Sequence, residues 1–338
     1  MRHVNIPIFI PHLGCPNQCV FCNQRTISGV AEFDIKSVEN SIIDALKTIT
    51  SDASVEIAFF GGSFTGIDCD LMVELLGIAK KYMDQGRVSS IRCSTRPDYI
   101  NDEVLNLLID YGVTTVELGL QSISDNVLLI AKRGHNFVAE QQAVDLIKRW
   151  GLELVGQMMV GLPGSTLEDE IATADFIINS GAKAARIYPT IVFKDTELYH
   201  MTVNGLYTPL DLESAVVRSA AVFDRLTNAG VAVIRIGLCA SENLMSEKTY
   251  YAGPNHPAIG ELVLNQYFLN IAKRKIDAIS PACGSTLKIC HPHGARSKIA
   301  GQKNRNKILL IDKYGLADII FTEDDSLSNF DITVMEER

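Results

Sequence analysis

The sequence predicts an α/β fold built on a parallel sheet, followed by a smaller C-terminal α/β region. Through the first two thirds of the chain, short apolar runs alternate with amphipathic helical stretches. Gly112, Gly151 and Gly181 each separate a predicted helix from the next strand, where a left-handed helix stop is expected. Six strand–helix units in series imply parallel strands with right-handed crossovers. This rhythm fits both an open doubly wound sheet and an incomplete barrel.

The expected elements follow one another in a regular order. Apolar runs predict strands at residues 4–10, 55–60, 88–94, 114–118, 152–159 and 184–188. Helical spacing, such as that of Val38, Ile42 and Leu46, predicts helices at residues 35–49, 71–83, 103–111, 137–150 and 167–180. The pattern changes after about residue 204. Helices are expected there at 210–228 and 258–273, with strands at 231–236, near 286–289 and near 307–311.

Composition limits the class of protein. The 338 residues are 47% hydrophobic and 21% charged, which fits a main globular domain with a smaller appendage. We find no signal peptide and no apolar stretch long enough to span a bilayer, so we expect a cytoplasmic protein without a membrane partner. A reducing compartment disfavours a disulfide framework for the eight cysteines. The net charge of −9 disfavours a nonspecific nucleic-acid binder, but it leaves room for a local basic face.

Three of the cysteines cluster after the first predicted strand. Cys15, Cys19 and Cys22 have the spacing C-x3-C-x2-C, and three thiolates on one short loop can hold three corners of a cubane iron–sulfur cluster. The fourth iron then lacks a protein ligand, and chemistry at a metal needs such an open position. A zinc site completed by His12 and three unrelated buried thiols are the alternatives.

The cysteine loop, with aromatic Phe21 just before its last cysteine, resembles the radical S-adenosylmethionine (SAM) superfamily. The resemblance implies that Cys15, Cys19 and Cys22 hold a 4Fe–4S cluster whose free iron is chelated by the amino and carboxylate groups of SAM. It also implies that one electron from the reduced cluster cleaves SAM into methionine and a 5′-deoxyadenosyl radical. The electron donor expected from the family is a flavodoxin or ferredoxin.

Further motifs follow at the ends of the predicted strands. In chain order they are residues 59–66, 93–99, 111–122, 133–135, 158–164 and 187–190. From about residue 7 to residue 207, the chain resembles the radical domain of the Elongator catalytic subunit and its bacterial relatives. The resemblance implies a partial parallel (β/α)6 barrel in residues 1–207 and a substrate-covering α/β region in residues 208–338. The sequence leaves no room for an acetyltransferase domain, so we expect a related modification and not the complete Elongator reaction.

The same resemblance implies which residues contact SAM. The two glycines after the second strand let the backbone approach a ligand and leave amide groups free. Glu117 can accept the ribose hydroxyls, or else pair with Arg96 or Arg133. Arg133 can hold the methionine carboxylate, or else be a solvated charge. The expected cofactor-binding set is Phe21, Gly61, Gly62, Ser63, Thr65, Arg96, Glu117, Gln121, Arg133, Met158, Gly161, Leu162 and Pro163.

The C-terminal region has two features of its own. Residues 288–307 form a basic stretch that could bind an RNA backbone, or could be a solvated surface that balances nearby carboxylates. Its cations are Lys288, Arg296, Lys298, Lys303, Arg305 and Lys307. Four loosely spaced residues are potential metal ligands: Cys283, Cys290, His291 and His293. We expect them to be buried thiols and loop histidines, with a second metal site as the alternative.

Three functional hypotheses follow. The first is radical modification of an RNA base, from the Elongator-like domain and the basic stretch. The second is radical chemistry on a small-molecule metabolite. The third is a non-enzymatic iron–sulfur carrier or sensor. The three-cysteine loop argues against a carrier, because a carrier is expected to have a fully ligated cluster.

Overall fold

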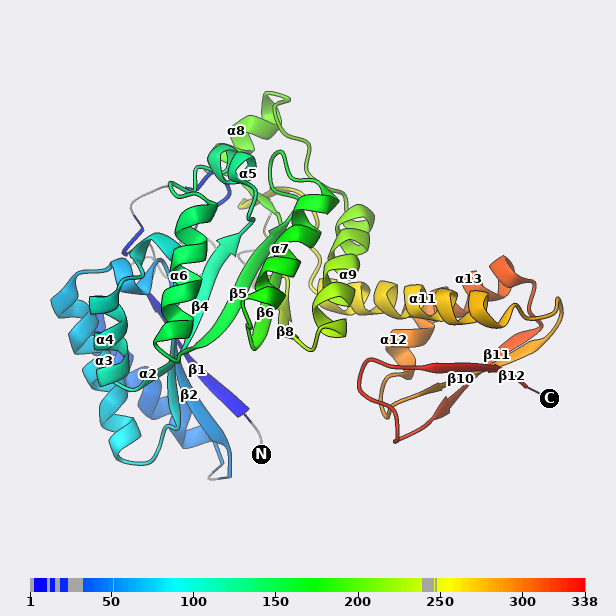
Figure 1. Cartoon of the computed structure of the whole chain (residues 1–338), viewed down its shortest axis with the longest axis horizontal. Helices are drawn as coiled ribbons and strands as arrows, with labels where there is room; N and C mark the ends of the chain where they lie inside the picture. The colour runs from blue at the N-terminus through cyan, green and yellow to red at the C-terminus, as the bar shows by residue number, and fades with distance from the viewer. Residues whose placement is uncertain are drawn as a thin grey trace.

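The computed structural model describes residues 3–10, 13–15, 19–23, 33–50, 52–238, 246 and 248–337. Figure 1 shows a large half-barrel on one side and a smaller α/β lobe on the other, with the long helix α11 (Ile259–Ile279) leading from one to the other. Within the described part of the chain, no helix is long and apolar enough to cross a membrane.

Over the residues that the structure describes, the half-barrel is a seven-stranded parallel sheet. Its strands are β1 (His3–Ile10), β2 (Ser54–Gly61), β3 (Ser90–Thr95), β4 (Val113–Gln121), β5 (Glu153–Val160), β6 (Ala184–Pro189) and β8 (Ala232–Ile236). They pair in the order β1-β2-β3-β4-β5-β6-β8. The six expected strands are confirmed, and so is the partial-barrel α/β class. Because the strands pair in chain order without a reversal, the sheet is not doubly wound.

The sheet holds one strand more than the six expected in the barrel. β8 is parallel to β6, with Ala184 opposite Ala232 and Ile187 opposite Ile236. It comes after residue 207, where the sequence places the domain boundary, and the crossover helix α9 (Leu212–Asn228) precedes it. The sheet therefore continues past that residue.

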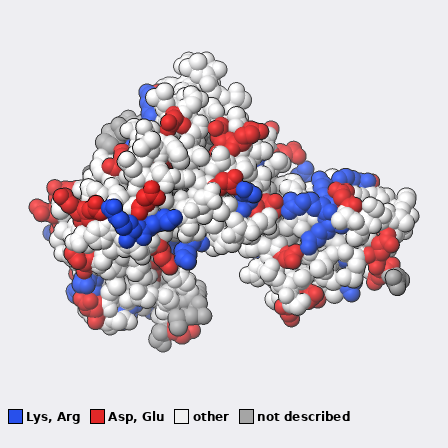
Figure 2. All heavy atoms as spheres, in the orientation of Figure 1, with Lys and Arg blue, Asp and Glu red and all other residues white. Residues whose placement is uncertain are grey.

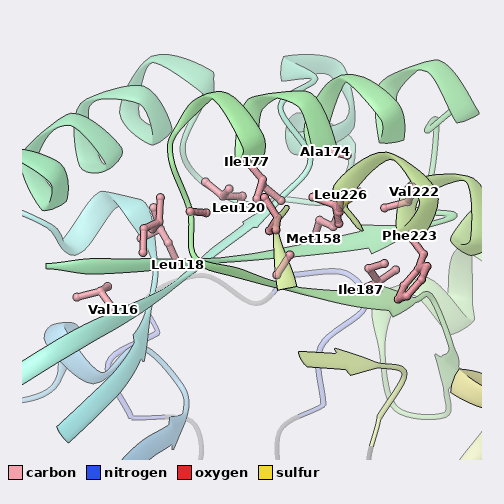
Figure 3. Packing of buried hydrophobic residues seen from close by; sticks show 14 of the residues in the cluster. Val116, Leu118, Leu120, Met158, Ala174, Ile177, Ile187, Val222, Phe223 and Leu226 are labelled. Atoms are coloured by element: carbon pink, nitrogen blue, oxygen red, sulfur yellow. The ribbon is translucent and has the colours of Figure 1, made fainter. Parts of the chain in front are cut away.

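Strand alternation gives the sheet two different faces, because successive side chains point to opposite sides. Leu118, Met158 and Ile187 point to the convex face, where Figure 3 shows them packed beneath α7 and α9 with Ile177 and Phe223. The helices of this layer are α2 (Ile35–Thr48), α3 (Cys69–Asp84), α4 (Asp102–Asp110), α6 (Phe137–Arg149), α7 (Leu167–Asn179) and α9. The alternate residues line the concave face.

The small lobe is a three-stranded sheet with helices. β10 (Thr286–His291) lies in the centre, parallel to β11 (Asp318–Glu323) and antiparallel to β12 (Thr333–Glu336). Two helices, α12 (Arg296–Ala300) and α13 (Arg305–Tyr314), connect β10 to β11. The expected strand near residues 307–311 is wrong, because these residues lie inside α13. A short apolar run fits a strand or a helix equally well in sequence, and here only Leu310 of the run is fully buried.

An aromatic cluster joins the two parts of the molecule. Phe223 on α9 packs edge-on against Tyr267 on α11, with ring centroids 4.9 Å apart, and against Phe330, 5.3 Å away. Phe223 is 2% exposed. Tyr267 donates a hydrogen bond to the Phe330 carbonyl at 3.1 Å. One buried ring therefore contacts residues far apart in the sequence.

Phe223→Ala is expected to lower the free energy of unfolding by about 3–5 kcal/mol, because it leaves a cavity between α9 and α11. Phe223→Leu retains more of the side-chain volume and should cost less, about 1–2 kcal/mol. Urea unfolding followed by circular dichroism measures both. Equal losses in the two variants would contradict the cavity argument, because Leu fills most of the space that Ala leaves empty.

Candidate functional site

The cysteine loop lies against the loop that follows β2. The Gly62 amide donates to the Ile10 carbonyl at 3.0 Å, and the Ser63 amide donates to the Leu13 carbonyl at 3.2 Å. A Cβ on Gly62 would lie 2.0 Å from the Leu13 oxygen, and a Cβ on Gly61 would lie 2.5 Å from the Ile10 oxygen. The close approach of two backbones therefore requires both glycines. The expectation of free amides is wrong for Gly62.

A buried hydroxyl cluster joins this loop to the end of β3. Ser63 Oγ lies 2.8 Å from Thr95 Oγ1, and Thr65 Oγ1 lies 2.6 Å from the same atom. The Arg96 amide donates to Ser63 Oγ at 3.2 Å. Ser63 and Thr65, which are expected to contact SAM, thus already have hydroxyl partners within the protein. They fix the backbone that leads into Arg96.

Two buried arginines flank Cys19. Arg133 Nη1 donates to Cys19 Sγ at 3.2 Å, and Arg96 Nη1 donates to the same sulfur at 3.8 Å. Arg133 also donates to the Gly119 carbonyl at 2.6 Å, and Arg96 donates to the Arg133 carbonyl. Burial raises the pKa of the Cys15 thiol, and the charges of both arginines act against that rise. The structure therefore brings Cys15, Cys19, Arg96 and Arg133 into one site.

A chain of polar side chains orients Arg96. Its Nε and Nη2 donate to the two Asp98 carboxylate oxygens at 2.9 and 2.8 Å. His135 Nδ1 lies 3.4 Å from Asp98 Oδ1, and His135 Nε2 lies 3.2 Å from Glu140 Oε1. Burial raises the pKa of Asp98, but hydrogen bonds from His135 and Arg96 outweigh it and hold that pKa well below its usual range. Burial raises the pKa of Glu140 to about 7, although His135 opposes the shift.

Val20 anchors the cysteine loop on its other side. The Val20 amide donates to the Ala131 carbonyl at 3.2 Å, and the Leu198 amide in α8 (Glu197–Val203) donates to the Val20 carbonyl at 2.8 Å. Val20, Ala131, Val192 and Leu198 form a small buried cluster, and Phe21 packs against its edge. The protein itself therefore fixes the position of Phe21.

Glu117 lies on the concave face between two arginines. Its Oε1 accepts from Arg92 Nη1 and from Arg186 Nη2, both at 2.9 Å, and Arg186 Nε lies 2.9 Å from Oε2. Glu117 is 1% exposed, so these cations compensate a charge that is costly to bury alone. The partners expected for an ion pair, Arg96 and Arg133, are wrong, because Arg92 and Arg186 take that place.

The charged network extends across the concave face. Arg92 Nε donates to Glu56 Oε2 at 2.8 Å, and Arg186 Nη1 lies 3.4 Å from the Tyr188 hydroxyl. The Arg186 guanidinium lies 5.2 Å from the Phe60 ring centroid. Glu56, Arg92 and Arg186 are not among the residues predicted from the sequence. The signal that could have found them is a charged residue at an alternate position within an apolar strand.

Two buried polar atoms near the strand ends have unmet hydrogen bonds. Gln121 ends β4 with a φ of 71°, next to a register shift against β5. Within the described part of the chain, Gln121 Oε1 and Arg133 Nε are buried without a hydrogen-bond partner. Buried polar atoms normally have partners, so these two suit the polar groups of a ligand.

The turn after β5 is held from two sides. The Gly161 amide donates to Glu170 Oε1 at 2.6 Å, and the Gly161 carbonyl accepts from the Tyr207 hydroxyl at 2.6 Å. Leu162 and Pro163 are buried in this turn. The turn thus lies at the carboxyl end of the sheet, where the sequence places it.

Met158 is a correction to the expected cofactor set. Its side chain is completely buried in the core beneath α7 and α9, on the convex face of the sheet, as Figure 3 shows. Met159 is partly exposed, and its side chain points to the opposite, concave face. Two adjacent apolar residues gave no signal about which one faces the site.

The metal ligands remain a prediction. Cys19 is buried, and Cys15 and Cys22 are half-buried. Over the residues that the structure describes, no three His, Cys, Asp or Glu side chains come close enough together to hold a metal ion. His12 and residues 16–18 and 24–32 lie outside the described residues.

The four candidate ligands in the small lobe lie in different surroundings. His291 and Cys290 are buried, whereas Cys283 is exposed. His293 is exposed and lies 3.2 Å from Glu323 Oε2. In the described part of this lobe they do not gather around a common point.

Comparison with known proteins decides the family. Residues 9–177, half of the chain, match the model of the radical SAM superfamily. The chain belongs to the radical SAM superfamily. Residues 182–268 match a radical SAM C-terminal domain. Radical SAM enzymes use a 4Fe–4S cluster and SAM and need a reductant, and this protein is an enzyme of that kind.

Its relatives include Elongator-type proteins. The tRNA uridine(34) acetyltransferase of Methanocaldococcus jannaschii is 33% identical over 157 residues, which cover 46% of this chain and 29% of that protein. Elongator complex protein 3 of Homo sapiens is 33% identical over 152 residues, which cover 43% of this chain and 28% of that protein. The chain thus spans less than a third of the length of these two relatives.

A solved structure confirms the fold. The archaeal Methanocaldococcus infernus Elp3, with an N-terminal deletion, superposes with a TM-score of 0.63 at 22% identity. The match covers 83% of this chain and 64% of that chain. The superposition therefore extends over most of this radical SAM enzyme.

The chemistry of the site fits both cofactors. Two buried guanidinium groups lie beside Cys19, where they would offset the negative charge of a thiolate-ligated cluster. Gln121 Oε1 and Arg133 Nε, which have no partner among the described residues, suit the amino and carboxylate groups of SAM. When bound, the reduced cluster supplies the electron that cleaves SAM. The protein's own residues would bind and orient both cofactors.

Gly62→Ala is expected to displace residues 10–14, because the new Cβ would lie 2.0 Å from the Leu13 oxygen. We expect a several-fold lower iron content after anaerobic reconstitution and a loss of about 1–3 kcal/mol in stability. The matched control is Gly77→Ala in α3, where the nearest atom is 4.0 Å away. It should keep its iron and gain about 0.5–1 kcal/mol. Full iron content in the Gly62 variant would contradict the steric role.

Glu140→Gln tests the buried chain behind Arg96. Burial raises the pKa of Glu140 to about 7 in the folded state, so the folded protein holds this proton more tightly than the unfolded chain does. The resulting stabilisation is complete at acidic pH and is lost as the pH rises through about 7. From about pH 5 to about pH 8, wild type should lose roughly 1–3 kcal/mol of stability relative to the variant. Urea unfolding at a series of pH values measures the difference.

The control for this titration is Glu39→Gln. Glu39 is at the surface, and its hydrogen bonds from Lys81 and Tyr82 lower its pKa. It stays ionised across the neutral range, so this variant should follow wild type with a constant offset. If Glu140→Gln behaves in the same way, Glu140 does not hold its proton in the folded state.

Proposed function

We propose that this radical SAM enzyme modifies an RNA base by removing a hydrogen atom from it. The observation that carries the proposal is the set of exposed or half-exposed cations in residues 288–307, on a chain similar to a tRNA uridine(34) acetyltransferase. Within the described residues, Lys288, Arg296, Lys298 and Lys303 have no carboxylate partner, in a protein whose net charge is −9. Unpaired cations of this kind favour a polyanion as the substrate.

The proposed roles follow the chemistry of each residue. Cys15, Cys19 and Cys22 ligate the cluster, and Arg96 and Arg133 balance its charge. Arg133 and Gln121 bind SAM, with the turns at Gly61 and Gly161 shaping the two sides of its pocket. A second group of residues positions the loops that carry these side chains and does not contact SAM itself: Gly62, Ser63, Thr65 and Phe21. Glu117 and the turn residues Leu162 and Pro163 complete the proposed set.

The proposed division of labour has the half-barrel make the radical and the C-terminal part bind substrate. We place the division near residue 207, with β8 contributing to the sheet from beyond it. A flavodoxin or ferredoxin is the proposed electron donor. The concave face between Arg92, Arg186 and Tyr188 supports a second candidate, a small anionic metabolite, because both arginines are partly exposed there.

The function is tested by hydrogen transfer. Reconstituted protein, SAM and dithionite are incubated anaerobically with total RNA, and label that passes from RNA deuterated in its bases into 5′-deoxyadenosine is measured by mass spectrometry. Transfer that depends on RNA supports the proposal. Cleavage of SAM without transfer from RNA favours the metabolite, and an intact cluster without any cleavage favours the electron carrier. Cys19→Ala, which removes a proposed ligand, should abolish cleavage.

A further inference from the structure

The small lobe contains a strand–helix–loop–helix–strand unit. β10 and β11 are parallel neighbours, with Thr286 opposite Asp318 and His291 opposite Glu323. α12, the four residues 301–304 and α13 connect them. Residues 301–304 are called the loop here; they include the short 3₁₀ turn η3 (Gln302–Asn304), in which Lys303 is not helical. Leu287 and Ile289 of β10 are fully buried in one core with Leu310. The unit lies beyond the two family matches, which end at residue 268.

The loop between the two helices is held in a fixed conformation. Gly301, Lys303 and Asn304 have φ values of 75°, 52° and 60°. Behind the loop, buried Asn265 accepts from the Gln302 amide at 3.2 Å. Buried Asn306 donates from Nδ2 to the Asn265 carbonyl at 2.8 Å and to Ile299 O at 3.1 Å. A Cβ on Gly301 would lie 2.9 Å from Asn306 Cγ, so glycine is required there.

The residues around this loop carry positive charge toward solvent. Arg296 and Lys303 are exposed, and no described carboxylate pairs with either. Arg305 lies 3.7 Å from Glu213, but both side chains are more than 70% exposed, and such a pair is weak. By contrast, Lys307 is paired with Asp318 at 2.7 Å. Figure 2 shows basic side chains gathered over the helices of this lobe.

Apolar surface adjoins the same cations. Ile308 and Leu309, which follow the loop on α13, are 54% and 40% exposed. In the described residues, the Asn304 side chain does not cap the first turn of α13. The loop therefore presents cations and uncapped backbone amides, both of which suit phosphate groups. The apolar side chains that follow on α13 suit the faces of unstacked bases.

We propose that residues 301–304, with Arg296 and Arg305 beside them, bind the backbone of single-stranded RNA in the manner of a KH module. In KH modules, a G-x-x-G loop between two helices clamps the backbone of about four nucleotides. Here the loop is Gly-Gln-Lys-Asn, with Asn304 at the position of the second glycine. Asn304 has a φ of 60°, a left-handed conformation that Asn adopts more readily than most residues other than glycine. This inference rests on the proposed function in one respect: that function is what makes the bound strand the substrate.

The test is the double variant Gln302→Asp/Lys303→Asp in the full-length, reconstituted enzyme. Both side chains are exposed, and Asp tolerates the left-handed backbone at 303, so the fold should be unchanged. The matched control, Gln142→Asp/Lys148→Asp, makes the same charge change at exposed positions of α6 on the half-barrel. Fluorescence anisotropy with a labelled single-stranded RNA of about ten nucleotides measures binding, and circular dichroism checks folding.

We expect the loop variant to bind RNA at least about tenfold more weakly, with a salt dependence reduced by about one phosphate contact. Cleavage of SAM in the absence of RNA should not change, and the control should bind like wild type.

Equal weakening in the loop variant and the control would overturn the inference, as would wild-type binding only to duplex RNA. If the loop variant binds like wild type while label still passes from RNA to 5′-deoxyadenosine, the loop inference fails and the proposed function stands. If the loop binds RNA but no label is transferred, the proposed function fails alone.

Discussion

The burial of two guanidinium groups beside one cysteine sulfur is the constraint on which the site depends. A buried cation is costly unless anions and carbonyls surround it. Arg96 therefore takes the Asp98 carboxylate, and Arg133 takes the Gly119 carbonyl, and both donate to Cys19. These contacts tie the cysteine loop to the ends of β3 and β4. The negative charge of a thiolate-ligated cluster would compensate the positive charges of these two arginines.

A second constraint acts through the backbone. The loop after β2 can lie against residues 10–14 only because Gly61 and Gly62 lack side chains. The hydroxyls of Ser63, Thr65 and Thr95 then fix the next segment. Steric fit and charge compensation thus act on the same few residues. Both act on loops at the carboxyl ends of the strands, where α/β barrels carry their active sites.

The two faces of the sheet carry different kinds of side chain. The convex face packs apolar side chains against helices, and the aromatic contact of Phe223 extends that core into the small lobe. The concave face instead carries an ion-pair network of Glu56, Arg92, Glu117 and Arg186. Each buried charge there has an opposite neighbour on another strand. The network can therefore stay buried without an uncompensated charge.

The sequence by itself determined the series of parallel strands, the cysteine loop and the glycine pair, because these depend on local periodicity and on spacing along one segment. Tertiary structure alone decided that Glu117 pairs with Arg92 and Arg186, since ion-pair partners on different strands depend on register. It also decided that Met158 lies in the core, because alternation shows which residues share a face but not which face is covered. It made residues 307–311 helical, where an apolar run fits either state. The strand–helix–loop–helix–strand unit was likewise visible only once β10 and β11 were paired.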